Sequence, residues 1–503
     1  MSGINNPFEK IVGSDRVLQP KNILLLLLIL GVAAWLASTL NLVIGLVMIL
    51  LPFVFIYLVF LFQRPVLGLY TAVIISFLIN GLSRYIDGLP FGLMMDGLLI
   101  LTLVSLFFKQ FYQKVDWSLA NKDVTWLAII WFAYAMLELF NPELGSYSAW
   151  INGMRSISFY MLLIVPLALI LMNTNRHLNN FFYVWGIFSI LVSLKGIAQN
   201  FLGVDPWEKT WLNEGGAVTH IIFGQLRIFS FLSDAGQFGA NQAYSAFVAG
   251  LLFFTRKEKW SKVFFASIAI LGFYGMILSG TRGAIAVPLA GFAALIVLRK
   301  KFLITLSGIL FLIMIVGFFK FTNIGQSNPY IRRTRSAFDF NDPSLQVRLE
   351  NQQKLKIFLA SRPFGGGLGQ AGVKAQRFLP NAFLSNIPTD SWYVMIWAEE
   401  GIIGLILHLL ILFYIIGKSS WLVMFRIRDP ILKIEIAALT SGMFGIMVAS
   451  YGNQVLGSMP TSILIYISMA FMLSSEKFDK LLFEKPDELA VNSLSIGYPD
   501  NSK

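Results

Sequence analysis

The dominant feature of this 503-residue chain is a series of apolar runs, each long enough to cross a lipid bilayer. We count about fourteen of them, since a transmembrane helix needs roughly 16–25 residues. They fall near residues 22–40, 42–62, 66–81, 91–108, 124–140, 157–172, 181–201, 235–254, 261–279, 283–298, 302–320, 391–417, 432–452 and 460–474. Continuous runs exclude a β-barrel, whose strands alternate in polarity. The sequence therefore predicts an all-α polytopic membrane protein with about 12–14 transmembrane helices.

The composition excludes several kinds of chemistry. The chain has no cysteine, which removes thiolate nucleophiles, disulfides and cysteine metal sites. Its three histidines argue against a histidine-rich metal centre. The net charge of +12 suggests anionic partners, although much of it is the Lys and Arg that orient helices. We expect no metal, no cofactor and no nucleic acid as a partner.

Positive charge alternates along the chain. Every second connection between apolar runs is basic, and the intervening connections are short and nearly uncharged. Because Lys and Arg mark cytoplasmic loops, both termini are predicted to lie in the cytoplasm. We divide the chain into four parts: a transmembrane bundle of about eleven spans, a large outer loop, the C-terminal transmembrane helices and a cytoplasmic tail. Their bounds are 1–320, 321–390, 391–475 and 476–503. The tail is predicted to start as a short amphipathic piece and then to be disordered.

Between residues 321 and 389 the large outer loop carries nine Lys and Arg against three acidic residues. Asp342 and Pro343 suit the start of a helix that should run to about Ser361. The run from Gly365 to Gly369 then has two interpretations. It either makes a tight turn back into the membrane, or offers the amides of Gly366, Gly367 and Gly369 to an anion.

Three carboxylates follow in TDSWYVMIWAEEGIIGL, at the mouth of the next span. Asp390 could cap that helix or act as a general base. Glu399 and Glu400 lie deeper, where carboxylates face a cavity or a partner cation. They either pair with an arginine and hold helices together, or Glu399 serves as a second candidate base.

Four stretches, taken in order, resemble the O-antigen ligase and O-antigen polymerase family of bacterial membrane glycosyltransferases. They are RIFSFLSDAGQFGAN, LSGTRGA, RPFGGGLGQAG and TDSWYVMIWAEEGIIGL, within residues 225–415. The resemblance implies a GT-C-like membrane enzyme with one large periplasmic loop. It implies transfer of glycans from undecaprenyl diphosphate to a glycan or lipid acceptor, in the bacterial inner membrane and without a metal or a nucleotide sugar. Membrane lipids, a chain-length regulator and other glycan-export proteins are the further partners considered.

The resemblance also assigns residues. Arg227, Arg282 and Arg348 fall where family arginines bind the diphosphate, and Arg282 would also stabilise the leaving group. Asp390 falls where ligases carry a histidine followed by asparagine, so the polymerase branch is favoured. Chemistry agrees, since a guanidinium is a permanently charged, bidentate phosphate ligand and a carboxylate can accept the proton of an acceptor hydroxyl.

Other interpretations stay open at this point. Taken alone, Arg282 could be a lipid-headgroup anchor whose stem lies in the bilayer. A ligase that transfers a finished glycan to lipid A core, another lipid or a protein would share the donor chemistry. A transporter or flippase would belong to another class, but it should carry charges deep in several spans. Here the conspicuous charges cluster at the outer mouth.

Overall fold

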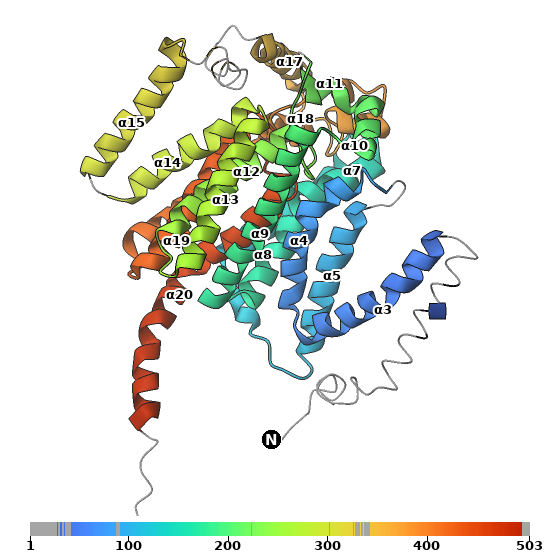
Figure 1. Cartoon of the computed structure of the whole chain (residues 1–503). Helices are drawn as coiled ribbons and strands as arrows, with labels where there is room; N and C mark the ends of the chain where they lie inside the picture. The colour runs from blue at the N-terminus through green and yellow to red at the C-terminus, as the bar shows by residue number, and fades with distance from the viewer. Residues whose placement is uncertain are drawn as a thin grey trace, which may run out of the picture. The chain divides into compact units, whose positions relative to one another are not determined.

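The protein is all-helical apart from one short strand pair in the described part of the chain (Figure 1). The computed structural model describes residues 28, 31, 32, 35, 42–86, 91–222, 224–300, 302–324, 326, 332, 335 and 343–494. The two strands, β1 (Ile221–Ile222) and β2 (Gln225–Leu226), pair antiparallel. The helices of the first half are α3 (Leu42–Gln63), α4 (Val66–Leu82), α5 (Phe91–Lys109), α6 (Asp123–Leu137), α7 (Tyr147–Met154), α8 (Tyr160–Leu171), α9 (Asn175–Leu202), α10 (Pro206–Trp211) and α11 (Ala217–His220).

The second half holds the helices that build the site. They are α12 (Ala235–Phe253), α13 (Lys259–Leu278), α14 (Ala286–Leu298), α15 (Phe302–Phe321), α17 (Pro343–Leu359), α18 (Trp392–Phe425), α19 (Pro430–Ala449) and α20 (Thr461–Leu494). Short 3-10 turns join several of them, including η5 (Arg282–Ile285) directly before α14. Every predicted span between residues 42 and 474 corresponds to one of these helices. The predicted span at 22–40 lies mostly outside the described residues.

Seven helical segments of the described chain are long and apolar enough to cross a membrane. They are Phe91–Lys109, Asp123–Phe140, Tyr147–Leu171, Asn175–Leu202, Lys259–Leu278, Trp392–Phe425 and Pro430–Ala449. Three further apolar helices are shorter, at Leu51–Gln63, Val66–Leu82 and Arg282–Leu298. The prediction of an all-α polytopic membrane protein is confirmed.

The predicted tail is partly corrected. A separate amphipathic piece was expected after residue 475, but α20 continues unbroken from Thr461 to Leu494. The first residues after 475, EKFDKLLFEK, contain no β-branched side chain, no glycine and no proline, so none of them favours the end of a helix that has already started. Asp479 on this helix accepts hydrogen bonds from the backbone N–H groups of Arg428 and Asp429. The tail helix is therefore tied to the turn between α18 and α19.

The chain divides into two compact units. One contains residues 1–72 and 93–119, and the other contains residues 73–92 and 120–503. In the first unit, α4 and α5 approach closely at Gly68, where an added Cβ would lie 1.9 Å from the Thr102 hydroxyl. Small residues allow such close helix packing in membranes. All the candidate site residues belong to the second unit.

Helix α12 is buried on nearly every side within the second unit. It contacts α9, α13, α14 and α19. Its polar side chains face these neighbours rather than lipid: Gln242 accepts hydrogen bonds from Ser189 and Ser193 of α9, and Asn241 donates to Thr461 of α20. Such interhelical hydrogen bonds satisfy polar groups that lipid cannot. They hold the N-terminus of α12 in a fixed place for the site.

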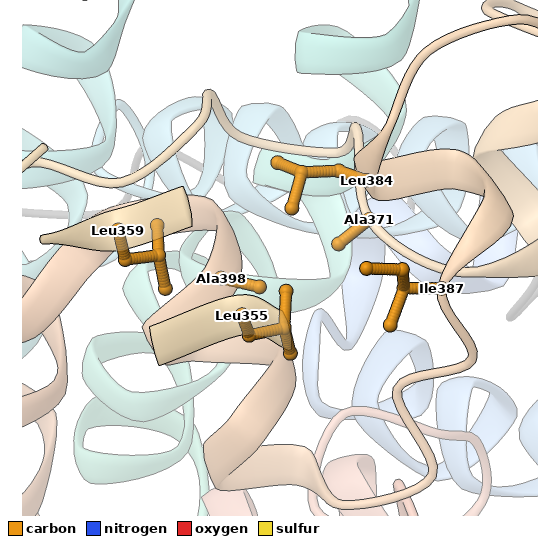
Figure 2. Close-up of a cluster of buried hydrophobic side chains, with 6 residues drawn as sticks. All are labelled: Leu355, Leu359, Ala371, Leu384, Ile387 and Ala398. Atoms are coloured by element: carbon orange, nitrogen blue, oxygen red, sulfur yellow. The ribbon is translucent and has the colours of Figure 1, made fainter. Parts of the chain in front are cut away.

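The large loop folds back onto the start of α18. Leu355 and Leu359 of α17 pack with Leu384 and Ile387 of the later loop and with Ala371 and Ala398, as Figure 2 shows. The apolar side chains of this helix thus pack against other parts of the protein. Helix α17 runs from Pro343 to Leu359, close to the predicted bounds, while Asp342 lies outside the described residues.

Candidate active site

Four helix ends meet at one place, which we call the site end. Helices α12 and α18 begin there, and α13 and α19 end there, so the connecting segments that precede α12 and α18 and follow α13 and α19 lie close together. Three of the four motif stretches that suggested the family supply these connections. The positions of their side chains follow from a series of hydrogen bonds and close contacts.

Arg227 contacts the segment that carries Arg282. The Arg227 guanidinium donates to the Thr281 hydroxyl at 2.9 Å and to the Thr219 carbonyl oxygen at 3.1 Å. The Thr281 hydroxyl in turn donates to the carbonyl oxygen of Ala235, the first residue of α12, at 2.9 Å. Arg227 and Arg282, which are 55 positions apart, therefore lie at neighbouring points around the start of α12. Both side chains are half-buried.

Arg348 and Asp390 form an ion pair, with 2.9 Å between Arg348 Nε and Asp390 Oδ2. Both side chains are accessible, at 38% and 52% exposure. The alternative that Asp390 caps its helix is wrong. Ser391 is the N-cap of α18 and accepts from the Val394 N–H, because the cap must stand directly before the first helical residue, here Trp392. The Asp390 carboxylate is thus left to pair with a cation.

The connection between α19 and α20, residues 450–460, joins these two groups. Gln454 donates from its side chain to the backbone oxygen and hydroxyl of Thr389, the residue before Asp390. Its neighbour Asn453 lies against Gly283, the residue after Arg282: an added Cβ on Gly283 would be 2.7 Å from the Asn453 amide nitrogen. This short segment therefore contacts the chain neighbours of both Arg282 and Asp390.

The glycine run makes a turn, and two of its amides already have acceptors. Gly365, Gly367 and Gly369 have positive φ, a conformation that favours glycine. The N–H groups of Gly366 and Gly367 donate to the carbonyl oxygens of Ala398 and Glu399 at 2.9 and 3.0 Å. They satisfy carbonyl groups at a break in α18, where Gly401 has φ +68°. A role for Gly366, Gly367 and Gly369 in binding a diphosphate stays a prediction.

Glu399 and Glu400 are both buried, at 3% and 0% exposure. Glu399 accepts a hydrogen bond from the Ala371 N–H at 3.1 Å, so it helps to hold the loop on α18. The expected ion pair with a bundle arginine is not found for either carboxyl group among the described residues. The backbone amides that the turn brings close to Glu399 take the place of that cation. Glu399 as a second base stays a prediction, although its burial separates it from the exposed Asp390.

One side chain near Arg227, His220, gains a role that the sequence pattern did not reveal. His220 is buried, its Nδ1 lies 2.9 Å from the Gly216 carbonyl oxygen, and its Nε2 accepts from the Ala235 N–H at 3.3 Å. Burial lowers the pKa of His220, which keeps the ring neutral and suited to accept from a helix N-terminus. The His220 carbonyl oxygen also accepts from the Arg227 N–H at 2.7 Å. His220 thus ties Arg227 to α12.

The arrangement suits an anionic ligand at the site end. Guanidinium groups recognise phosphate oxygens with a planar fork of donors, and an accessible carboxylate nearby can accept a proton. Within the described residues, no group of three or more His, Asp or Glu side chains is placed to hold a metal ion. These features define a class: a multi-pass helical membrane protein with arginines and one carboxylate gathered where four helix ends meet.

Comparison with known proteins narrows this class. The sequence model of the O-antigen ligase family matches residues 265–409. An O-antigen polymerase of Salmonella muenchen is 25% identical over 310 residues, which cover 60% of this chain and 75% of that relative. Over these residues the chain is similar to the O-antigen ligase and O-antigen polymerase family, which is the resemblance that its motifs predicted. No solved structure matches the chain.

Proposed function

We propose that the protein is a polymerase of lipid-linked glycans. In this proposal it joins oligosaccharide repeat units carried on undecaprenyl diphosphate, and it does so at the periplasmic face of the bacterial inner membrane. The product would be an O-antigen, a capsule or an exopolysaccharide. The transfer uses neither a metal nor a cofactor.

The main support is the contact series at the site end. Arg227 reaches Thr281, beside Arg282; Arg348 pairs with Asp390; and residues 453 and 454 contact Gly283 and Thr389, the neighbours of Arg282 and Asp390. A lipid-linked diphosphate is anionic and lies at headgroup level, so arginines at the membrane surface are its natural ligands. The similarity to an O-antigen polymerase over 60% of the chain favours polymerisation over other uses of such a site.

The proposed chemistry is a single displacement at a sugar. An acceptor hydroxyl oxygen bonds to the anomeric carbon of the donor glycan, and the bond from that carbon to the phosphate oxygen breaks. The electron pair leaves with undecaprenyl diphosphate, whose growing negative charge Arg227 and Arg282 stabilise. The acceptor proton passes to Asp390. Arg348 holds the Asp390 carboxylate in place until the acceptor enters.

Orientation follows from the charge pattern. The basic connections lie in the cytoplasm in this proposal, together with both termini. The site end and the large loop then lie in the periplasm, where lipid-linked repeat units are exposed. A chain-length regulator and other glycan-export proteins remain candidate partners, and membrane lipids surround the bundle.

Purified lipid-linked repeat units test the proposal directly. The protein in lipid nanodiscs should convert them into a ladder of longer glycans that still carry the lipid, and EDTA should leave the ladder unchanged. Asp390→Asn should remove the ladder, because an amide cannot accept the proton. A wild-type protein that binds the units but never lengthens them would refute polymerisation, and loss of the ladder with EDTA would refute metal independence.

A ligase is the second candidate, because the matching family model is described as O-antigen ligase. The same nanodiscs can be given a long lipid-linked glycan together with lipid A core. A ligase would move the glycan to the core and would make no ladder from repeat units alone. A polymerase would make the ladder from repeat units and would not move the long glycan to the core.

A further inference from the structure

The α19–α20 connection is held rigidly from both sides. On the α18 side, the Trp392 N–H donates to the Ser450 carbonyl oxygen at 2.9 Å, and Gly457 lies directly against the Trp392 ring. On the α12 side, the Gln237 side chain donates to the Ser458 carbonyl oxygen at 2.9 Å. A segment fixed at both ends keeps the side chains between these anchors in defined positions.

Asn453 lies between the two glycines nearest to Arg282 and to the start of α12. An added Cβ would lie 2.7 Å from the Asn453 amide nitrogen at Gly283, and 3.1 Å from its amide oxygen at Gly236. Any larger residue at either position would displace this side chain. Asn453 therefore has a defined place beside the arginine segment, one residue away from the Gln454 side chain that binds Thr389.

The Asn453 amide is available for a ligand. The side chain is half-buried, and within the described chain it makes no hydrogen bond to another group. A half-buried amide without a protein partner is suited to bind a polar ligand, since its hydrogen-bonding groups otherwise stay unsatisfied or bind water. The nearby Asp234 carboxylate makes its hydrogen bonds elsewhere, where it accepts from the Gln237 N–H and the Ser233 hydroxyl.

We propose that Asn453 is a further substrate-binding residue, whose amide nitrogen donates to a phosphate oxygen of the diphosphate between Arg227 and Arg282. This inference rests on the proposed function. It adds a neutral donor to the cationic ones and brings it from a different part of the chain. Because Gln454 fixes Thr389, the same segment also sets the position of Asp390 relative to the bound phosphate.

Two substitutions separate binding from packing. Asn453→Asp keeps the size of the side chain but places a negative charge beside the phosphates, whereas Asn453→Ala removes the donor without adding charge. If Asn453 binds phosphate, affinity for undecaprenyl diphosphate should fall roughly tenfold in Asn453→Ala. It should fall further in Asn453→Asp. If Asn453 only packs, Asn453→Asp should bind like the wild type and Asn453→Ala should be the less stable variant.

The measurement is binding of undecaprenyl diphosphate to the full-length protein in nanodiscs, with thermal unfolding recorded in parallel. Asn213→Asp is the matched control, because Asn213 is exposed and lies outside the site contacts. Wild-type affinity in both Asn453 variants, alongside weakened binding in Arg282→Lys, would overturn this inference and leave the proposed function standing. A wild-type protein that neither binds the lipid nor lengthens repeat units would refute the proposed function itself.

Discussion

Arginines near the site end differ in what their guanidinium groups contact. Arg84 donates to the carbonyl oxygens of Ser230, Leu232 and Ser233, and lies over the rings of Trp211 and Phe229. Burial lowers the pKa of Arg84 to about 10, so it still carries its charge at neutral pH. Its donors bind the loop before α12, which makes Arg84 a structural residue. Arg348, by contrast, is accessible and binds one carboxylate.

Replacement of Arg282 by lysine tests the diphosphate role. Lysine keeps the positive charge but loses the fork of donors that fits a phosphate. We expect roughly a tenfold to hundredfold loss of polymerising activity, the usual value for hydrogen bonds between charged groups. The measurement is the rate of ladder formation from lipid-linked repeat units.

Arg377→Lys is the control for this experiment, since Arg377 is exposed in the large loop and binds Asn152 outside the site. It should keep full activity. Nearly normal ladder formation by Arg282→Lys would favour the alternative in which Arg282 anchors the helix in the headgroups.

At the scale of elements, the break in α18 connects the large loop to the membrane bundle. Gly401 has φ +68°, and an added Cβ would lie 2.0 Å from the Pro363 carbonyl oxygen. The loop amides of Gly366 and Gly367 satisfy the carbonyl groups that the break exposes. These hydrogen bonds hold the loop against the first turns of α18, which begin directly after Asp390 and the N-cap Ser391.

Gly401→Ala should therefore destabilise the protein and misplace Asp390. A positive φ alone costs about 1–2 kcal/mol for a residue with a Cβ, and the contact with Pro363 adds to this cost. Thermal unfolding in detergent should show a clear loss of stability together with lower activity. Gly417→Ala provides the comparison within the same helix, since nothing lies within 4 Å of its added Cβ. Equal stability of the two variants would mean that the break is not needed.

At the scale of the whole molecule, the absence of cysteine makes the topology directly measurable. A single cysteine at the exposed Lys354 of α17 should react with a membrane-impermeant maleimide in intact spheroplasts. A cysteine at the exposed Lys257, between α12 and α13, should react only after the membrane is opened. The reason is the excess of Lys and Arg in cytoplasmic connections. Labelling in the opposite order would reverse the orientation and move the site end to the cytoplasm.

The positions of the helices were predictable because the thickness of the bilayer sets the length of the apolar run that can cross it. An apolar run of sufficient length must become a helix in lipid, where each backbone group needs an internal partner. The start of α17 at Pro343 and the turn at Gly365–Gly369 were also predictable, since proline and glycine restrict or free the backbone locally. The extent of α20 was not predictable. Charged and polar residues indicate exposure to water, and they do not indicate where a helix ends.

The sequence by itself determined the class of fold, the helix positions and the family resemblance, since all three depend on local composition or on the order of short motifs. Only the tertiary structure decided which side chains meet. It paired Arg348 with Asp390, which are 42 positions apart, and brought Asn453 beside Gly283. Such contacts depend on how helix ends converge after packing, and no local pattern of residues encodes the distance between two side chains that are far apart in the sequence.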